Sequence, residues 1–275
     1  MVLSLIKSEC FEAGKRLNFN RKGVLSGLKG GLFIKSEGLM RHFKSKMKDK
    51  TTKMEGRIGS KAGLARVLSG LKGFDEAKVR LEQYPTDGET AADILWNMYI
   101  LGDIDGKVIV DLGAGTGILG IGAGLLGAKK VILVDMDKNA LNIVKENISK
   151  LKSEGYDSIC DMEIVERDIE SRVGKEGGEG KKVIKGDIVV ENPPFGTKVR
   201  HADIMFLEKA LEIASVVYSL HKSESKGFLE KFAGKRMVKM THAWKYELPL
   251  KAAFGFHTRR IHRISVSCFR FSTTN

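Results

Sequence analysis

The sequence predicts a doubly wound α/β fold, with a mostly parallel sheet and an antiparallel hairpin at its carboxyl-terminal end. Helical and strand patterns alternate through most of the chain beyond residue 60, which is typical of this fold class. The strands are short β-branched runs, such as residues 188–190, as expected of buried parallel strands. Residues 237–248 and 261–271 form two longer strand patterns that can pair as the closing hairpin.

The chain is long enough for one α/β domain with an appendage, and it is strongly basic. Its 275 residues carry a net charge of +13, which favours a polyanionic partner but does not separate RNA, DNA and membrane surface. Residues 1–57 hold 14 basic against 5 acidic side chains and show weak periodicity. We expect a flexible basic arm over residues 1–57 and a folded domain over 58–275, although a natural start at Met54 explains the arm equally well.

Cysteine usage and hydropathy bound the environment of the protein. The three cysteines lie far apart, and neither they nor the histidines have metal-ligand spacing, so we expect no metal and no disulfide framework. The longest apolar run, residues 118–128, is too short and too rich in glycine to span a bilayer, and no signal-peptide pattern precedes it. We therefore expect a cytoplasmic protein that does not associate with membranes.

A helix and an extended stretch precede the first predicted strand. Apolar residues at helical spacing from position 61 onward predict a helix that ends at Gly73. Residues 79–86 are expected to be extended, and Thr86 or Asp87 can cap the next helix. Gln83 and Thr86 could close over a bound cofactor, or the stretch could simply lead into a helix that covers the sheet edge.

A glycine-rich turn follows the first strand of the predicted sheet. The strand, residues 107–112, leads through Gly113 and Gly115 into an apolar helix at 118–126. Glycines at such a turn let the backbone approach a ligand closely, and the amino end of the helix offers N–H groups. A dinucleotide fingerprint needs a glycine where this chain has Ile118, so the pattern argues against NAD.

Acidic side chains follow the next two strands. The strand at 130–134 ends in Asp135, about 20 residues past Gly115, where a carboxylate can bind both ribose hydroxyls. Asp137 is a candidate helix cap. Asp168, just past the strand at 162–166, could accept from an adenine amino group, although an isolated Asp there is more often a turn former.

The remaining elements are expected to be a helix at 139–151, a loop at 172–185, a helix at 203–215, a strand at 216–220 and a helix at 224–232.

Residues 192–195, which read Asn-Pro-Pro-Phe, are the strongest candidates for catalysis. Because two prolines end the preceding strand, Asn192 lies at its carboxyl end, where open α/β sheets bind ligands. The Asn192 side chain and the Pro193 carbonyl could both accept hydrogen bonds from an NH2 group, and Phe195 could stack on a base. Pro194 would hold the bend. A Pro-Pro turn with a core phenylalanine is an equally good interpretation of this tetrapeptide alone.

The order of these motifs resembles class I S-adenosylmethionine-dependent methyltransferases that act on exocyclic or amide nitrogens. More narrowly, the chain from about Lys61 onward is similar to the methyltransferase-like-five family, which methylates N6 of one adenosine in small-subunit ribosomal RNA. The similarity rests on residues 81–86 (Leu-Glu-Gln-Tyr-Pro-Thr), 192–198 (Asn-Pro-Pro-Phe-Gly-Thr-Lys), 218–222 (Tyr-Ser-Leu-His-Lys) and 269–271 (Phe-Arg-Phe). Two departures are Asp87-Gly88-Glu89, where a proline is usual in the family, and a longer loop around 174–180.

The resemblance implies a Rossmann-like class I methyltransferase domain with a seven-stranded, mostly parallel sheet and a C-terminal antiparallel hairpin. It implies S-adenosylmethionine as cofactor and adenosine N6 in RNA as methyl acceptor, with Asn192, Pro193, Pro194 and Phe195 catalytic. The residues that it assigns to the cofactor are Gln83, Thr86, Asp111, Gly113, Gly115, Asp135 and Asp168. Eukaryotic relatives also work with a small zinc-binding activator protein that pairs with an edge strand.

Basic and aromatic residues outside this set are candidates for RNA contact. Lys198 follows Phe195 closely and would lie near the pocket, and Arg200, Phe256 and His257 could extend a rim that contacts RNA. A solvated charged surface is the competing interpretation. The alternatives to an RNA methyltransferase are a protein glutamine N5-methyltransferase, a DNA adenine methyltransferase and a non-catalytic RNA-binding scaffold.

Overall fold

The computed structural model describes residues 58–74, 85–157, 159–169, 183–195, 202–250 and 262–273. All of them belong to one compact unit, Met54–Asn275. The predicted basic arm lies outside the described residues, so the division into an arm and a domain stays a prediction.

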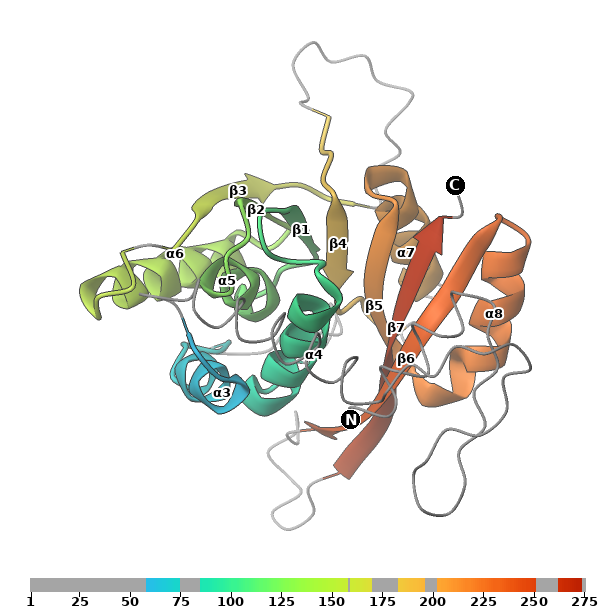
Figure 1. Ribbon diagram of the computed structural model, residues 1–275, viewed down its shortest axis with the longest axis horizontal. Helices are drawn as coiled ribbons and strands as arrows, with labels where there is room; N and C mark the ends of the chain where they lie inside the picture. The colour runs from blue at the N-terminus through green and yellow to red at the C-terminus, as the bar shows by residue number, and fades with distance from the viewer. Residues whose placement is uncertain are drawn as a thin grey trace, which may run out of the picture. The chain divides into compact units, whose positions relative to one another are not determined.

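The described residues form a seven-stranded sheet with the order β3-β2-β1-β4-β5-β7-β6 (Figure 1). The first five strands in this order pair in parallel, and β7 pairs antiparallel with both β5 and β6. The predicted α/β fold with its closing hairpin is therefore confirmed. The strands are β1 (Val108–Leu112), β2 (Lys130–Asp135), β3 (Asp161–Glu166), β4 (Ile188–Glu191), β5 (Val216–Lys222), β6 (Val238–Leu250) and β7 (His262–Thr273).

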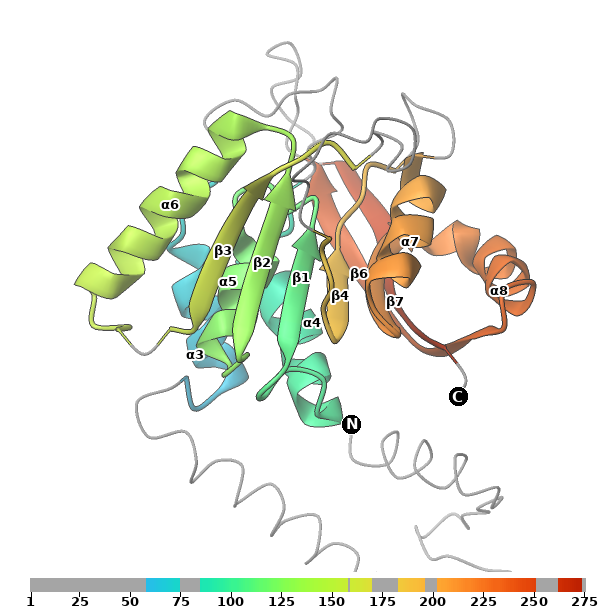
Figure 2. The same ribbon diagram turned by 90° about the horizontal axis from the view of Figure 1, so that it is seen from above.

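Helices cover both faces of the sheet. The helical segments are α3 (Lys61–Ser69), α4 (Gly88–Leu101), α5 (Ile118–Leu125), α6 (Lys138–Ser153), α7 (Ala202–Ile213), η2 (Ser223–Ser225) and α8 (Lys226–Gly234). Side chains of α3 to α6 join one apolar core cluster, and side chains of α7 and α8 join a second. Figure 2 shows α4 and α7 on opposite sides of the sheet.

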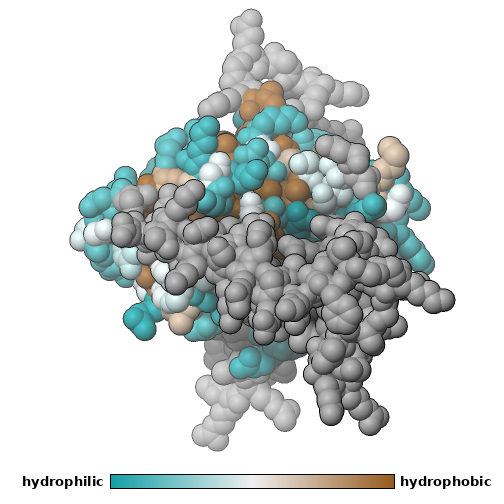
Figure 3. Space-filling view, viewed as in Figure 1, coloured by the Kyte–Doolittle hydropathy of each residue, from teal (hydrophilic) through white to brown (hydrophobic). Residues whose placement is uncertain are grey.

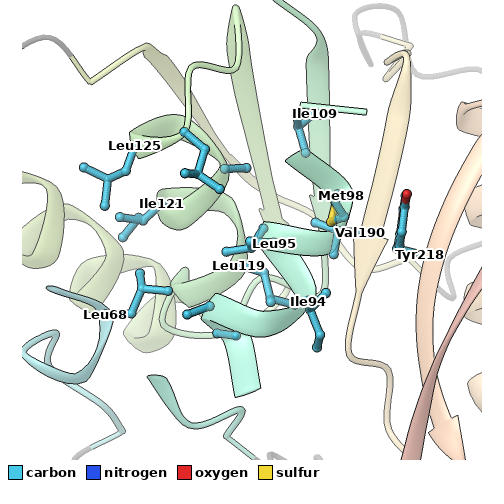
Figure 4. Close-up of a cluster of buried hydrophobic side chains, with 14 of the residues drawn as sticks. Leu68, Ile94, Leu95, Met98, Ile109, Leu119, Ile121, Leu125, Val190 and Tyr218 are labelled. Carbon is cyan, nitrogen blue, oxygen red and sulfur yellow. The ribbon is translucent and has the colours of Figure 1, made fainter. Parts of the chain in front are cut away.

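The central strands are buried on both faces, which explains their near-continuous β-branched sequence. Along β4, Val190 belongs to the cluster on the α4 side and Val189 to the cluster on the α7 side, and neither side chain is exposed to solvent. Figure 4 shows how Leu95 of α4 and Ile121 of α5 pack toward the strands on the first face. Each such side chain contributes roughly 1.5–3 kcal/mol on burial. Figure 3 shows hydrophilic residues over much of the described surface, with hydrophobic residues visible between them.

Two helix caps predicted from the sequence are confirmed, and one predicted helix end is wrong. Asp87 and Asp137 cap α4 and α6, because their side chains accept from the backbone N–H groups of Thr90 and Asn139. The helix α3 ends at Ser69 rather than at Gly73, which was the wrong terminator. Gly70 is the cap residue, and its N–H donates back into the last turn of the helix.

The predicted helix at 224–232 is also shifted. Residues Ser223–Ser225 form a 3-10 turn and the α-helix α8 begins only at Lys226. No helix in the described part of the chain is both long and apolar enough to cross a membrane.

Candidate active site

The turn between β1 and α5 depends on glycine. Gly113, Gly115 and Gly117 have φ angles of 72°, 53° and 85°, in the left-handed region that side chains with a Cβ rarely adopt. The N–H groups of Gly113 and Ala114 both donate to the carbonyl of Val134, at 2.8 and 2.9 Å. This pairing ties the turn to β2 and fixes the path of the backbone.

Two aromatic rings lie close against this turn. A Cβ added to Gly113 would come within 2.9 Å of the Phe206 ring, and one added to Gly115 within 3.0 Å of the Phe74 ring. Phe206 belongs to α7, whereas Phe74 follows α3 and is half-buried. Neither Phe74 nor Phe206 is among the site residues predicted from the sequence. No local pattern distinguishes either ring from an ordinary hydrophobic side chain.

The carboxylate of Asp135 is held by the backbone at the carboxyl end of β2. Its Oδ2 accepts from the N–H of Gly115 at 2.7 Å, and its Oδ1 accepts from the N–H of Asp137 at 2.8 Å. Burial raises the pKa of Asp135, and these N–H groups oppose that rise. Because each carboxylate oxygen has two acceptor sites, the group can also accept from ligand hydroxyls.

Asp111 is a buried carboxylate on β1 that supports the start of α5. Its Oδ2 accepts from the N–H of Gly120 at 2.7 Å, which satisfies one of the N–H groups at the amino end of the helix. Burial raises the pKa of Asp111 to about 7, and the negative charge of Asp135 adds to the rise. The residue therefore has a structural role whether or not a cofactor is bound.

Asp168 lies near the same edge of the sheet but on its surface. It is exposed, and it follows Arg167, whose N–H donates to the carbonyl of Asp135 at 2.8 Å. The structure thus places Asp168 past β3, next to the strand end that carries Asp135.

Asn192 is anchored by a residue from a distant part of the chain. Its Nδ2 donates to Oγ1 of Thr86 at 3.1 Å, and Thr86 is only 5% exposed. Thr86 precedes Asp87, the cap of α4, so the start of this helix sets the rotation of the Asn192 amide. Because Nδ2 is directed at Thr86, the acceptor atom Oδ1 faces away from Thr86.

The register of the sheet brings Asn192 to the glycine turn. Leu112 of β1 pairs with Glu191 of β4, so the chains leave the sheet side by side as Gly113 and Asn192. From β1 the chain proceeds to β2 and β3 on one side, and from β4 to β5 on the other. The strand order therefore reverses between β1 and β4, which is where open α/β sheets bind their ligands.

The rest of the Asn-Pro-Pro-Phe segment is largely enclosed. Pro193 is buried, Pro194 is half-buried, and Phe195 is 6% exposed and joins the apolar cluster on the α4 side. The other predicted site residues, Gln83, Lys198, Arg200, Phe256 and His257, lie outside the described residues.

A chain of hydrogen bonds lies beside this segment on the other face of the sheet. The hydroxyl of Ser219 is 2.7 Å from Oε1 of Glu191 and 2.8 Å from Nε2 of His221. Nδ1 of His221 is 3.2 Å from Oδ2 of Asp203, near the start of α7. We call this set, Glu191, Ser219, His221 and Asp203, the buried polar chain.

The sequence does not predict the buried polar chain, because Ser219 and His221 stand out in it only as part of the family motif at 218–222. Burial raises the pKa of Glu191 to about 8, with a further rise from the nearby charges of Asp203 and Asp111. Burial also raises the pKa of Asp203, but the interaction with His221 and the backbone N–H groups at the start of α7 outweigh that effect, so the pKa of Asp203 is lowered on balance.

The described residues contain no group of three or more His, Cys, Asp or Glu side chains that could hold a metal ion. The chemistry that this geometry offers comes instead from a glycine turn with a fixed carboxylate, next to an amide that is held by its nitrogen. Such a site can hold a nucleoside-containing ligand on the β1 and β2 side and present hydrogen-bond acceptors at the end of β4.

Comparisons with known proteins agree with this geometry. Residues 85–246 match the family model described as conserved hypothetical protein 95. The chain is 35% identical over 214 residues to the rRNA N(6)-adenosine-methyltransferase METTL5 of Danio rerio, covering 77% of this chain and 98% of the relative. It is 37% identical over 211 residues to an uncharacterized protein of Methanocaldococcus jannaschii, covering 76% and 93%.

A solved structure supports the same assignment. A crystal structure from Pyrococcus horikoshii has 43% sequence identity and a TM-score of 0.66, and the match covers 78% of this chain and 98% of that one. The chain therefore belongs to the conserved hypothetical protein 95 family and to the METTL5-like family that its motifs resemble.

Proposed function

We propose that this protein transfers a methyl group from S-adenosylmethionine to N6 of an adenosine in RNA, with small-subunit ribosomal RNA as the substrate. The observation that carries the proposal is the anchored amide of Asn192, next to the glycine turn at the point where the strand order reverses. Relatives in Danio rerio and Drosophila melanogaster, 35% and 32% identical, are named as rRNA N(6)-adenosine-methyltransferases.

The residues around the glycine turn suit S-adenosylmethionine, which supplies an electrophilic methyl group on a sulfonium. The positive φ angles of Gly113 and Gly115 bring bare backbone to the edge of the sheet. Asp135 would accept from the ribose hydroxyls, and its bonds to two N–H groups keep its oxygens in position. Asp168 would bind the adenine amino group, and Gln83 and Thr86 would cover the cofactor. Asp111 would contribute negative charge near the cofactor cation.

Asn192 and Pro193 would prepare the adenine N6 for attack. The N6 lone pair is delocalised into the ring, which makes the amine a poor nucleophile. Oδ1 of Asn192 and the Pro193 carbonyl would accept its two protons and direct the lone pair toward the methyl group. Orientation of this kind can supply several of the roughly 7–11 kcal/mol gained by well-aligned reactants. Pro194 would hold the bend, and Phe195 would form the wall on which the base stacks.

The acceptor base must be unpaired to reach a pocket at the end of a strand. This requirement suits an adenosine in an RNA loop or junction, which is where proteins commonly recognise RNA bases. The net charge of +13 favours a polyanion over the glutamine of a protein substrate, whose amide could make the same hydrogen bonds. Lys198, Arg200, Phe256 and His257 are the proposed contacts with the RNA around the pocket.

Two finer points are also part of the proposal. The partner set includes a small zinc-binding activator protein, for which β3 and β6 are the edge strands of the described sheet. The proposed location is the cytoplasm, which suits the free cysteines Cys160 and Cys268 within the described residues.

The test is a comparison of acceptors. Purified protein would be incubated with labelled S-adenosylmethionine and, separately, with ribosomal RNA, tRNA, DNA and release-factor protein. We expect label on N6 of one adenosine in ribosomal RNA, located by mapping the modified nucleotide. Label on a glutamine of the release-factor protein would show instead that the protein is a glutamine N5-methyltransferase. Cofactor binding without transfer to any acceptor would favour a scaffold.

A further inference from the structure

The buried polar chain joins the two ends of the segment that carries the candidate catalytic residues. Glu191 directly precedes Asn192, and Asp203 is the second residue of α7, which follows that segment. The link between them runs through Ser219 and His221, which project from the same face of the neighbouring strand β5. One set of hydrogen bonds therefore connects Glu191, just before Asn192, with Asp203, at the start of α7.

The cost of burying this set argues that it has a purpose beyond stability. Glu191, Ser219 and His221 are each 0% exposed, and apolar residues fill the equivalent positions elsewhere on this face of the sheet. Replacing a buried polar network by packed apolar side chains is often neutral or stabilising, so stability alone does not explain its presence. Among the described residues, Oε2 of Glu191 has no hydrogen-bond partner. A network with one unsatisfied oxygen is costly to keep.

We propose that the buried polar chain is a positioning device for methyl transfer, which holds the end of β4 so that the Asn192 amide and the Pro193 carbonyl face the acceptor amine. This inference rests on the proposed function for its catalytic readout. None of its members contacts the acceptor in this account. They act through the backbone between Glu191 and Asn192, on the face of β4 opposite to Thr86.

The number of hydrogen bonds that the buried polar chain can form depends on pH. The Ser219 hydroxyl has one proton and two close neighbours, so it can donate to only one of them. When Glu191 is protonated it donates to Ser219, Ser219 donates to His221, and His221 donates to Asp203, so every link is formed. When Glu191 loses its proton and His221 is neutral, Ser219 must choose between them. One link is then lost.

The charges around Glu191 favour the complete chain at neutral pH. The carboxylates Asp111 on β1 and Asp203 on α7 disfavour its ionisation. His221 on β5 lies beyond Ser219 in the same set. Because burial and these charges raise the pKa of Glu191 to about 8, the link breaks on the alkaline side of neutrality. The buried polar chain is therefore expected to hold Asn192 and Pro193 in position only up to about pH 8.

Three variants test the proposal. Ser219→Ala removes the central hydroxyl, and Glu191→Gln keeps the shape of the side chain but cannot ionise. Tyr246→Phe is the matched control, because it deletes a half-buried hydrogen bond of 2.9 Å to Asp93 on the α4 side of the sheet. Each protein would be measured for kcat and KM on ribosomal RNA across pH, for thermal unfolding, and for backbone hydrogen exchange in peptides that contain Asn192 and Phe195.

The expected results separate positioning from folding. Ser219→Ala should lower kcat by about tenfold, equivalent to one lost hydrogen bond, while the KM for S-adenosylmethionine stays within about twofold. Glu191→Gln should keep kcat near neutrality and lose the fall in rate that the unaltered protein shows above about pH 8. Exchange at Asn192 should rise about tenfold in Ser219→Ala and stay unchanged in Tyr246→Phe.

Two outcomes would overturn the inference. One is a Ser219→Ala protein that matches Tyr246→Phe in kcat and in exchange. The other is a fall in rate above about pH 8 that is the same in Glu191→Gln and in the unaltered protein. This second comparison decides the matter even if Ser219→Ala does not fold. If the unaltered protein methylates no RNA, the proposed function fails. The hydrogen-exchange comparison still shows whether the buried polar chain holds residues 192–195 in place.

Discussion

The side chain of Asn192 donates through Nδ2 to Oγ1 of Thr86 across 3.1 Å, although the two residues are 106 positions apart in the sequence. An asparagine amide carries a donor end and an acceptor end, and the hydrogen-bond partner determines which end faces a substrate. By holding the donor end, Thr86 directs the acceptor end of the amide away from α4. The start of a helix therefore determines which group an acceptor base meets.

The first prediction concerns the amide itself. Asn192→Ala should lower kcat by about a thousandfold or more, because the oriented acceptor contributes to alignment worth several kcal/mol. The dissociation constant of S-adenosylmethionine should stay within about twofold, because Asn192 would contact the acceptor rather than the cofactor. Calorimetric titration and single-turnover kinetics on ribosomal RNA would check both. Equal losses in binding and transfer would show that its role is different.

The second prediction concerns the anchor. Thr86→Val removes the hydroxyl but keeps the shape, so the amide can rotate and present its NH2 group to the acceptor. We expect kcat to fall about tenfold, the effect of one hydrogen bond, whereas Thr86→Ser keeps the hydroxyl and should retain most activity. Steady-state kinetics on the three proteins would decide. Similar kcat values for Thr86→Val and Thr86→Ser would remove Thr86 from the account.

The fold could be predicted from sequence because its signals are local. The β-branched run at 188–190 marks a buried strand, and Asp137 precedes an apolar helical pattern that it caps. The end of α3 was placed wrongly because Gly70 and Gly73 both follow the helix and either can terminate it. Sequence offers no rule that chooses between two glycines three residues apart.

The site was predictable only in part because its contacts are distant in sequence. The family motif assigns Thr86 to the cofactor, and nothing in the sequence indicates that it also pairs with Asn192. Glu191 reads as a charge at the end of a strand, and only the pairing of β4 with β5 puts Ser219 beside it. Such polar pairs have no periodicity, so they become visible only when the register of the sheet is known.

The third prediction tests the carboxylate at the end of β2. Asp135→Asn places an NH2 group opposite a backbone N–H, either that of Gly115 or that of Asp137, and it weakens the acceptor for the ribose hydroxyls. We expect the dissociation constant of S-adenosylmethionine to rise by roughly 10- to 100-fold, or about 1.4–2.7 kcal/mol. Glu166→Gln is a matched control, because Glu166 is the exposed register partner of Asp135 on β3. Its titration should match that of the unaltered protein.

The fourth prediction concerns the half-buried ring of Phe74, which lies against Gly115. If this ring forms part of the cofactor site, Phe74→Ala should raise the dissociation constant of S-adenosylmethionine by about tenfold through lost apolar contact. Phe228→Ala, which removes a 52% exposed ring from α8, should have no effect on the same titration. Unchanged binding by Phe74→Ala would leave the ring with a packing role only.

The fifth prediction follows from the pKa of Asp111, which burial raises to about 7 from the ordinary value of 3.8. Between these two values the folded protein binds a proton that the unfolded chain has released. The free energy of unfolding therefore falls as the pH rises from about 4 to about 7, by an amount on the order of 4 kcal/mol for a full shift of this size. Glu191, with a pKa raised to about 8, adds a fall in the same direction up to that pH.

Asp111→Asn should remove the Asp111 contribution to this fall and leave a shallower profile, because the amide cannot ionise and its oxygen can still accept from the N–H of Gly120. The fall contributed by Glu191, which begins near its ordinary pKa of 4.5 and extends up to about pH 8, should persist, since Glu191 is intact. Urea unfolding at a series of pH values would measure both proteins. Saturating S-adenosylmethionine should reduce the fall in the unaltered protein, because a bound cation stabilises the ionised carboxylate. The contrary result is a free energy of unfolding that rises with pH between 5 and 7 in the unaltered protein but not in Asp111→Asn. That result would contradict the buried, partly protonated state of Asp111.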